Sequence, residues 1–221
     1  MQAVFETVFD VAYLFTVLFL GIKMVKESRG VTQFVLYGVM ALVLGLGDSF
    51  HLIPRAVALS TKGLDAYTGA LGIGKCITSV TMTLFYMLLY YVWRERYGIR
   101  GKEKLTGVVW LLSAARIILV LMPQNQWLSK TPPLSWGIYR NIPFVLLGFL
   151  MITLFYRSGK EHDDADFRHL WLTIALSFGF YLPVVLLAGA VPPVGALMIP
   201  KTGAYVWTVW IGYHSMKQEM G

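Results

Sequence analysis

The sequence predicts an all-α integral membrane protein with seven transmembrane helices, and three observations support this class. Hydrophobic residues make up 57% of the 221 positions and charged residues only 14%, which is far from the balance of a soluble domain. Long apolar runs recur along the whole chain, and each is near the roughly 20 residues that a helix needs to cross a bilayer. The charged residues gather between these runs. We therefore expect residues 1–221 to form a single membrane domain.

The predicted spans follow the apolar runs in order. They cover residues 4–22, 31–53, 68–93, 105–122, 136–156, 168–189 and 199–216. The first run follows Glu6 without a basic residue, and no small-residue cleavage motif closes it, so we interpret it as a helix rather than a signal peptide. The single cysteine, Cys76, excludes an internal disulfide.

Basic residues between the spans predict the orientation. Twelve Lys and Arg residues follow the first, third, fifth and seventh spans, whereas the opposite connections hold three, namely Arg55, Lys62 and Lys130. Positively charged loops stay in the cytoplasm. We therefore expect a multi-pass protein of the plasma membrane, with its N-terminus outside the cell and its C-terminus in the cytoplasm. We expect no nucleic-acid partner, because the Lys and Arg residues that make the pI basic serve to orient the protein among membrane lipids.

A possible internal repeat connects the two ends of the chain. GALGIGK, at residues 69–75, matches GALMIPK, at residues 195–201, in five of seven positions. Residues 1–93 and 136–221 would then be parallel repeats, with the helix at residues 105–122 as a linker. A three-plus-one-plus-three layout with the N-terminus outside resembles the architecture of the sugar-transporting SWEET family. The resemblance covers topology only. Members of that family carry Pro-Gln pairs inside helices, whereas the only Pro-Gln pair here, residues 123–124, falls in a predicted outer loop.

Charged residues inside the predicted spans mark the candidate site. In LGDSFHLIPR, residues 46–55, the spacing of Asp48, His51 and Arg55 places all three on one helix face. Ionisable side chains in a bilayer must face protein or water, so we expect an outward-facing polar cavity. The predicted ligand-binding residues are Asp10, Asp48, His51, Lys75, Arg116, Arg140, Asn141 and Lys201.

The sign of these charges predicts the ligand. The outer spans and loops hold seven basic residues against four acidic ones, and a positive surplus in a low-dielectric cavity attracts anions. Arg116 and Arg140 are suited to clasp a carboxylate or phosphate. We therefore expect a transporter for a small anionic or amphipathic ligand, or a protein that binds a lipid head group.

Other interpretations stay open. Ion pairs such as Asp10 with Arg116 would only fix helices together, while Arg55, Lys75 and Lys201 would extend to lipid phosphates. A lipid hydrolase or transferase at the outer leaflet would use Asp48, His51 and Arg116, with Ser49 or water as nucleophile. A receptor or accessory subunit needs only the ligand site.

We expect no metal and no other cofactor. A zinc hydrolase would need three or four convergent ligands, but His51 lies at the predicted outer end and the other histidines at the inner end. A site built from His169, His214 and the acidic residues near them is the remaining possibility for a metal.

Overall fold

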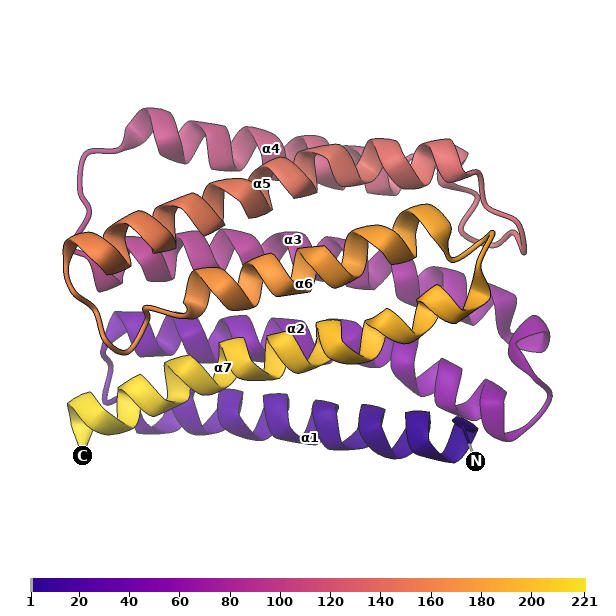
Figure 1. Cartoon of the computed structure of the whole chain (residues 1–221), viewed down its shortest axis with the longest axis horizontal. Helices are drawn as coiled ribbons and strands as arrows, with labels where there is room; N and C mark the ends of the chain where they lie inside the picture. Colours follow the sequence, from indigo (N-terminus) through magenta and orange to yellow (C-terminus); the bar gives the residue numbers. More distant parts are fainter. Residues whose placement is uncertain (1) are drawn as a thin grey trace.

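Seven long helices lie along the long axis of the molecule (Figure 1). This computed structural model describes residues 2–221, which contain no strand. The helices are α1 (Gln2–Glu27), α2 (Thr32–Ser60), α3 (Thr68–Arg96), α4 (Glu103–Leu121), α5 (Leu134–Glu161), α6 (Leu170–Leu187) and α7 (Met198–Met220). The short 3-10 helices are η1 (Leu64–Tyr67), η2 (Pro123–Asn125) and η3 (Pro192–Leu197).

Consecutive helices run antiparallel to one another (Figure 1). The N-terminus and the α2–α3, α4–α5 and α6–α7 connections lie at one end, called here the N-terminal end, and the C-terminus lies at the other (Figure 1). Each helix packs against the next one along the chain, and α7 also packs against α1 and α2. The first and last helices therefore close the bundle.

The outer surface of the bundle is apolar. Large hydrophobic side chains are exposed along several helices, among them Phe15, Leu111 and Phe149. Soluble monomers do not carry so much exposed apolar surface. Six helices, α1 to α6, are long and apolar enough to cross a membrane, which supports a multi-pass membrane protein.

The seventh predicted span, residues 199–216, is confirmed as a helix, while its crossing of the membrane stays a prediction. These residues do form a helix, α7, but it is not among the six that are apolar enough to be a membrane span on composition alone. Several of its polar side chains are buried against other helices, including Lys201, Thr208 and Ser215. Part of the polarity of α7 therefore faces the interior of the bundle, while its polar C-terminal residues are exposed.

Helix α2 continues past the predicted boundary at residue 53. Pro54 lies inside it, and the helix ends only at Ser60. A proline removes one backbone hydrogen bond, here the one to the carbonyl of Phe50, and near a helix end this disturbs little else. Arg55 is consequently a helical residue.

Close backbone contact joins α2 to α3. A Cβ atom added at Gly74 would collide with the carbonyl oxygen of Phe50, which is the oxygen that Pro54 leaves without its helical partner. A Cβ atom added at Gly47 would collide with the hydroxyl of Thr81. Glycine at both positions lets these two helices approach closely near Asp48 and His51.

Candidate functional site

A central polar cluster lies inside the bundle, and each of the seven long helices contributes to it. Its members are Tyr13, Asp48, Tyr86, Ser113, Arg116, Asn141, Ser177, Tyr181, Lys201 and Tyr205. Among these, the structure brings together four of the predicted ligand-binding residues: Asp48, Arg116, Asn141 and Lys201. Both positive charges, Arg116 and Lys201, are buried.

Asp48 is held at the α1 side of the cluster. The hydroxyl of Tyr13 donates a hydrogen bond of 2.6 Å to Oδ2 of Asp48. Lys201 interacts electrostatically with Asp48 but lies beyond ion-pair distance, since no ion pair joins them in residues 2–221. The carboxylate therefore compensates the ammonium only in part.

Lys201 enters the cluster from α7 between two aromatic rings. Its Nζ lies 5.2 Å from the centroid of the Tyr181 ring and 5.3 Å from that of Tyr205. The side chain is only 7% exposed, so the alternative in which Lys201 reaches the lipid phosphates is wrong. A buried cation over two ring faces gains cation–π attraction but no neutralising charge.

Asn141 and Tyr181 connect α5 with α6. The hydroxyl of Tyr181 donates a hydrogen bond of 2.9 Å to Oδ1 of Asn141, while Nδ2 of Asn141 donates to the carbonyl of Gly137 at 2.8 Å. The Tyr181 ring is the same one that borders Lys201. Asn141 is thus linked to the charged part of the cluster through one side chain.

Arg116 points from α4 into the bundle and is 2% exposed. Its Cζ lies 3.1 Å from the centroid of the Phe144 ring. Nε and Nη1 are buried without a hydrogen-bond partner, and no carboxylate in residues 2–221 forms an ion pair with this side chain. An uncompensated buried charge costs several kcal/mol, and no carboxylate of the described chain offsets that cost at Arg116.

Ser113 lies one helical turn before Arg116 on the same helix. It is 1% exposed, and its Oγ also has no hydrogen-bond partner within the described chain. Residues three apart share a helix face, so the hydroxyl and the guanidinium border the same region. Together they offer an anion both a neutral and a charged donor.

Arg140 has a different environment from that of Arg116. Its Nη1 donates a hydrogen bond of 2.8 Å to Oδ1 of Asn125, and its Cζ lies 4.4 Å from the Trp127 ring centroid. Nδ2 of Asn125 in turn donates to the carbonyls of Leu119, Val120 and Met122 at the end of α4. Arg140 therefore supports a C-terminal cap of α4.

The remaining predicted residues lie around the N-terminal end. Arg55 forms an ion pair of 2.8 Å with Glu6 of α1, and Asp10 is an electrostatic neighbour of both. The alternative ion pair between Asp10 and Arg116 does not form in residues 2–221. Helix α1 packs on α2 and α7 rather than on α4, which explains this difference.

His51 and Lys75 lie near one another, where α2 meets α3. His51 neighbours Lys75 and the backbone of Leu71 on α3, and its buried Nδ1 has no hydrogen-bond partner in residues 2–221. Lys75 is exposed, in contrast to Lys201, the lysine that matches it in the suggested repeat. Asp48 therefore contacts α1, whereas His51 contacts α3.

The acid-base pair of the hydrolase hypothesis is not assembled in this geometry. Asp48 accepts from Tyr13, and no hydrogen bond joins it to His51 in the part of the chain described. The hydroxyl of Ser49 donates to the carbonyl of Leu46 at 2.6 Å. In residues 2–221, no group of three or more His, Cys, Asp and Glu side chains is arranged to hold a metal ion.

Sequence reasoning missed the hydroxyl groups of the cluster. Tyr13, Ser113 and Tyr205 were not predicted, because tyrosine and serine are common in membrane helices and do not stand out as charges do. The available signal was spacing, since Tyr205 lies one turn after Lys201 and Ser113 one turn before Arg116.

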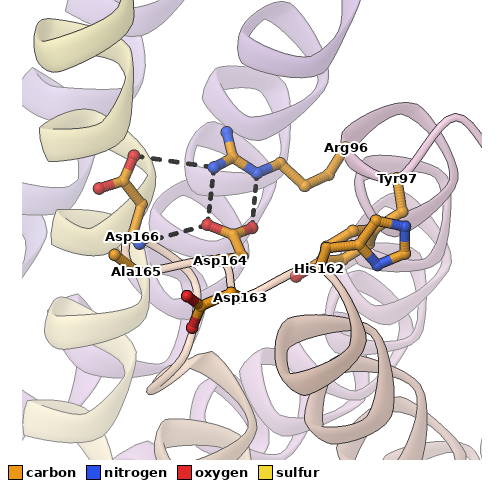
Figure 2. A pocket seen from close by; sticks show the side chains of 7 residues that line it. All are labelled: Arg96, Tyr97, His162, Asp163, Asp164, Ala165 and Asp166. Atoms are coloured by element: carbon orange, nitrogen blue, oxygen red, sulfur yellow. Dashed lines mark hydrogen bonds and ion pairs between the residues drawn. The ribbon is translucent and has the colours of Figure 1, made fainter.

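A second charged cluster lies at the C-terminal end and borders an open pocket of about 400 Å³. Figure 2 shows Arg96 reaching from α3 to Asp164 and Asp166 in the α5–α6 connection, with Tyr97 and His162 beside one another. Arg96 binds Asp164 through Nε at 2.8 Å and Nη2 at 2.7 Å, and its Nη1 also pairs with Glu219 of α7. This arginine therefore joins three parts of the bundle.

The carboxyl group of Asp164 is stabilised in its charged form. Burial alone would raise its pKa, but the hydrogen bonds and charge of Arg96 outweigh burial and hold the pKa below the ordinary value. The backbone N–H of Phe167 donates to the same carboxylate at 3.2 Å. Arg96, Asp164, Asp166 and Glu219 are thus joined by ion pairs in this second cluster.

A further pocket of about 210 Å³ lies between α5 and α6. Seven aliphatic side chains and Asn141 line it, and its surface is almost entirely apolar. Asn141 therefore belongs both to this groove and to the central polar cluster.

Comparisons with known proteins give no relative from which to assign a function. No family model, no curated protein and no solved structure matches this chain.

Proposed function

We propose that this protein binds a small anion, a carboxylate or a phosphate, inside its helix bundle and transports it across the membrane. One observation carries the proposal: the buried guanidinium of Arg116 has two nitrogens without a partner and no carboxylate in residues 2–221 to neutralise it. A bound anion would accept those hydrogen bonds and supply the missing negative charge.

The rest of the central polar cluster supports the same ligand. Arg116 and Lys201 bring two positive charges, whereas Asp48 brings one negative charge and is already bonded to Tyr13. The surplus is positive and lies in a region of low dielectric, where attraction of an anion is strong. Ser113 adds a hydroxyl donor next to Arg116.

Transport is the use we propose for this site. Ionisable residues of both signs within membrane helices are typical of substrate pathways. The distribution of basic residues favours an N-terminal end that faces the outside of a plasma membrane. A parallel repeat is supported by the short 3-10 helices η1 and η3, which precede the helices carrying Lys75 and Lys201, respectively.

Ligand-induced stabilisation tests the binding step. A ligand that binds only the folded state raises its stability, by about 2.7 kcal/mol at a concentration of 100 Kd. We expect acetate, inorganic phosphate or sulfate to raise the unfolding temperature of the detergent-purified protein above that in chloride at equal ionic strength. Arg116→Met should abolish the shift. Lys62→Met, which removes one exposed charge from the same end, should retain it.

Counterflow in proteoliposomes tests the transport step. The stabilising anion, supplied in labelled form, should accumulate in vesicles that contain the unlabelled anion, and this uptake should be lost in Arg116→Met. Saturable binding without uptake would replace transport with a receptor function. If no anion shifts the unfolding temperature, the central polar cluster has a structural role and the proposal fails.

A further inference from the structure

The groove between α5 and α6 lies on the lipid-facing side of the bundle. Side chains such as Ile142 and Leu186 line it and are about half exposed, so the groove opens on the apolar outer surface of the bundle. Its volume of about 210 Å³ is below the roughly 300 to 1,000 Å³ of pockets that hold drug-sized ligands. That space suits part of one hydrocarbon chain better than a ring system or two chains.

Asn141 is the one polar residue among those that line this groove, and its amide group bonds inside the bundle. The residue is 5% exposed, and Oδ1 accepts the hydrogen bond from Tyr181, whose ring lies 5.2 Å from Nζ of Lys201. Phe144, one turn further along α5, is the residue that contacts the unpaired guanidinium of Arg116. An apolar groove and a positively charged cluster therefore share the same stretch of α5.

The geometry points to one occupant for both regions: an anion with a single hydrocarbon chain, such as a fatty-acid carboxylate from the bilayer. The chain lies in the groove, and the head group lies toward Arg116 and Lys201. The amide of Asn141 and the hydroxyl of Tyr181 are hydrogen-bonding groups at the boundary. This inference rests on the proposed anion site and narrows its substrate class to single-chain amphiphiles.

Charge and shape agree in this assignment. A carboxylate compensates the positive surplus left by Arg116 and Lys201, while its chain meets a surface made of aliphatic side chains. A free inorganic anion would use the charges but leave the groove to membrane lipid. Chain length therefore distinguishes the two ligands.

A chain-length series in nanodiscs provides the test. Binding of acetate, butyrate, hexanoate and octanoate should tighten by about threefold to fourfold for each methylene that enters the groove. Leu186→Trp fills the groove and should flatten this dependence while acetate still binds. Leu187→Trp is the matched control, because Leu187 is 47% exposed against 48% for Leu186 but does not line the groove.

The outcomes separate this inference from the proposed function. If acetate and octanoate bind equally well, the groove holds no chain but the anion site stands. If chain length matters equally in both tryptophan variants, the chain lies elsewhere in the bilayer and the inference is wrong. If no carboxylate binds, the proposed function fails as well. Leu186→Phe, a smaller change with the same expected direction, keeps the test valid should Leu186→Trp not fold.

Discussion

Two arginines near opposite ends of the bundle, one partly buried and one fully buried, differ in their partners. At the C-terminal end, Arg96 makes a two-nitrogen contact with Asp164 and also pairs with Glu219. Toward the N-terminal end, Arg116 is more deeply buried and has no acidic partner in residues 2–221. Because both side chains carry the same charge, the difference lies in what surrounds them. The paired arginine ties helices together, whereas the unpaired one is the basis of the ligand site that we propose.

The position of each arginine along the chain agrees with this division. Arg96 connects α3, the α5–α6 connection and α7, which are distant in sequence. Arg116 extends from α4, which packs only on its neighbours α3 and α5. The loss of Arg96 should therefore loosen several elements, while the loss of Arg116 should affect little beyond the central polar cluster.

The largest expected effect is the loss of stability in Arg96→Met. The substitution leaves Asp164, whose side chain is 6% exposed, without its counter-charge. Breaking one side of a buried ion pair costs about 3 kcal/mol or more. Denaturation in detergent should show this loss. Arg100→Met is the control, since Arg100 is largely exposed and should change stability by less than about 1 kcal/mol.

An intermediate effect is expected from Asp164→Asn, and it depends on pH. Arg96 holds the pKa of Asp164 in the folded protein below the pKa that this carboxyl group has in the unfolded chain. The ion pair therefore makes its full contribution to the free energy of unfolding above about pH 4, and this contribution is lost as the pH falls through the pKa of the folded state. The variant should be less stable than the wild type by about 2 kcal/mol near neutral pH. This difference should narrow as the pH falls below about 4.

Asp163→Asn provides the comparison for that experiment. Asp163 is exposed, forms no ion pair in residues 2–221 and lines the same pocket. Its substitution should leave both the stability near neutral pH and its acid dependence unchanged. An equal effect of the two substitutions would show that Arg96 does not depend on Asp164 in particular.

The smallest loss of stability is expected from Arg116→Met. Removing an uncompensated buried charge gains several kcal/mol, while losing the contact with Phe144 costs about 2 kcal/mol, so the substitution should not destabilise the protein. The free energy of unfolding without ligand should be at least that of the wild type. A loss as large as that of Arg96→Met would mean that Arg116 is paired in the folded protein.

Much of the helical framework was predictable, because the apolar runs are long and charges separate them. Seven helices occur where seven were predicted, yet the apolarity of α7 was overestimated. Its buried residues Lys201, Thr208 and Ser215 show why: a polar side chain on the inner face of a helix counts against a span on composition alone. Helix α2 runs beyond the predicted apolar span, through Pro54 to Ser60, and this agrees with the expectation that Arg55 shares a helix face with Asp48 and His51.

The candidate site was predictable only in its charges. Arg116 and Lys201 stand out in sequence because ionisable residues are rare within membrane helices. Their partners depend on how each helix rotates against its neighbours, which one sequence does not determine. Asp48 and His51 illustrate this, because they are three residues apart but contact α1 and α3, respectively.

The close contact of α2 with α3 restricts which residues related proteins can carry at two glycine positions. Positions 47 and 74 have no space for a Cβ atom, whereas a Cβ atom at Gly195 or Gly203 would meet nothing within 4 Å. In an alignment of proteins that share an ancestor with this one, glycine should therefore persist at positions 47 and 74 and vary freely at 195 and 203. Thr81 and the carbonyl of Phe50 fill the space next to these glycines. Substitutions on the facing surfaces of α2 and α3 should therefore occur in correlated pairs.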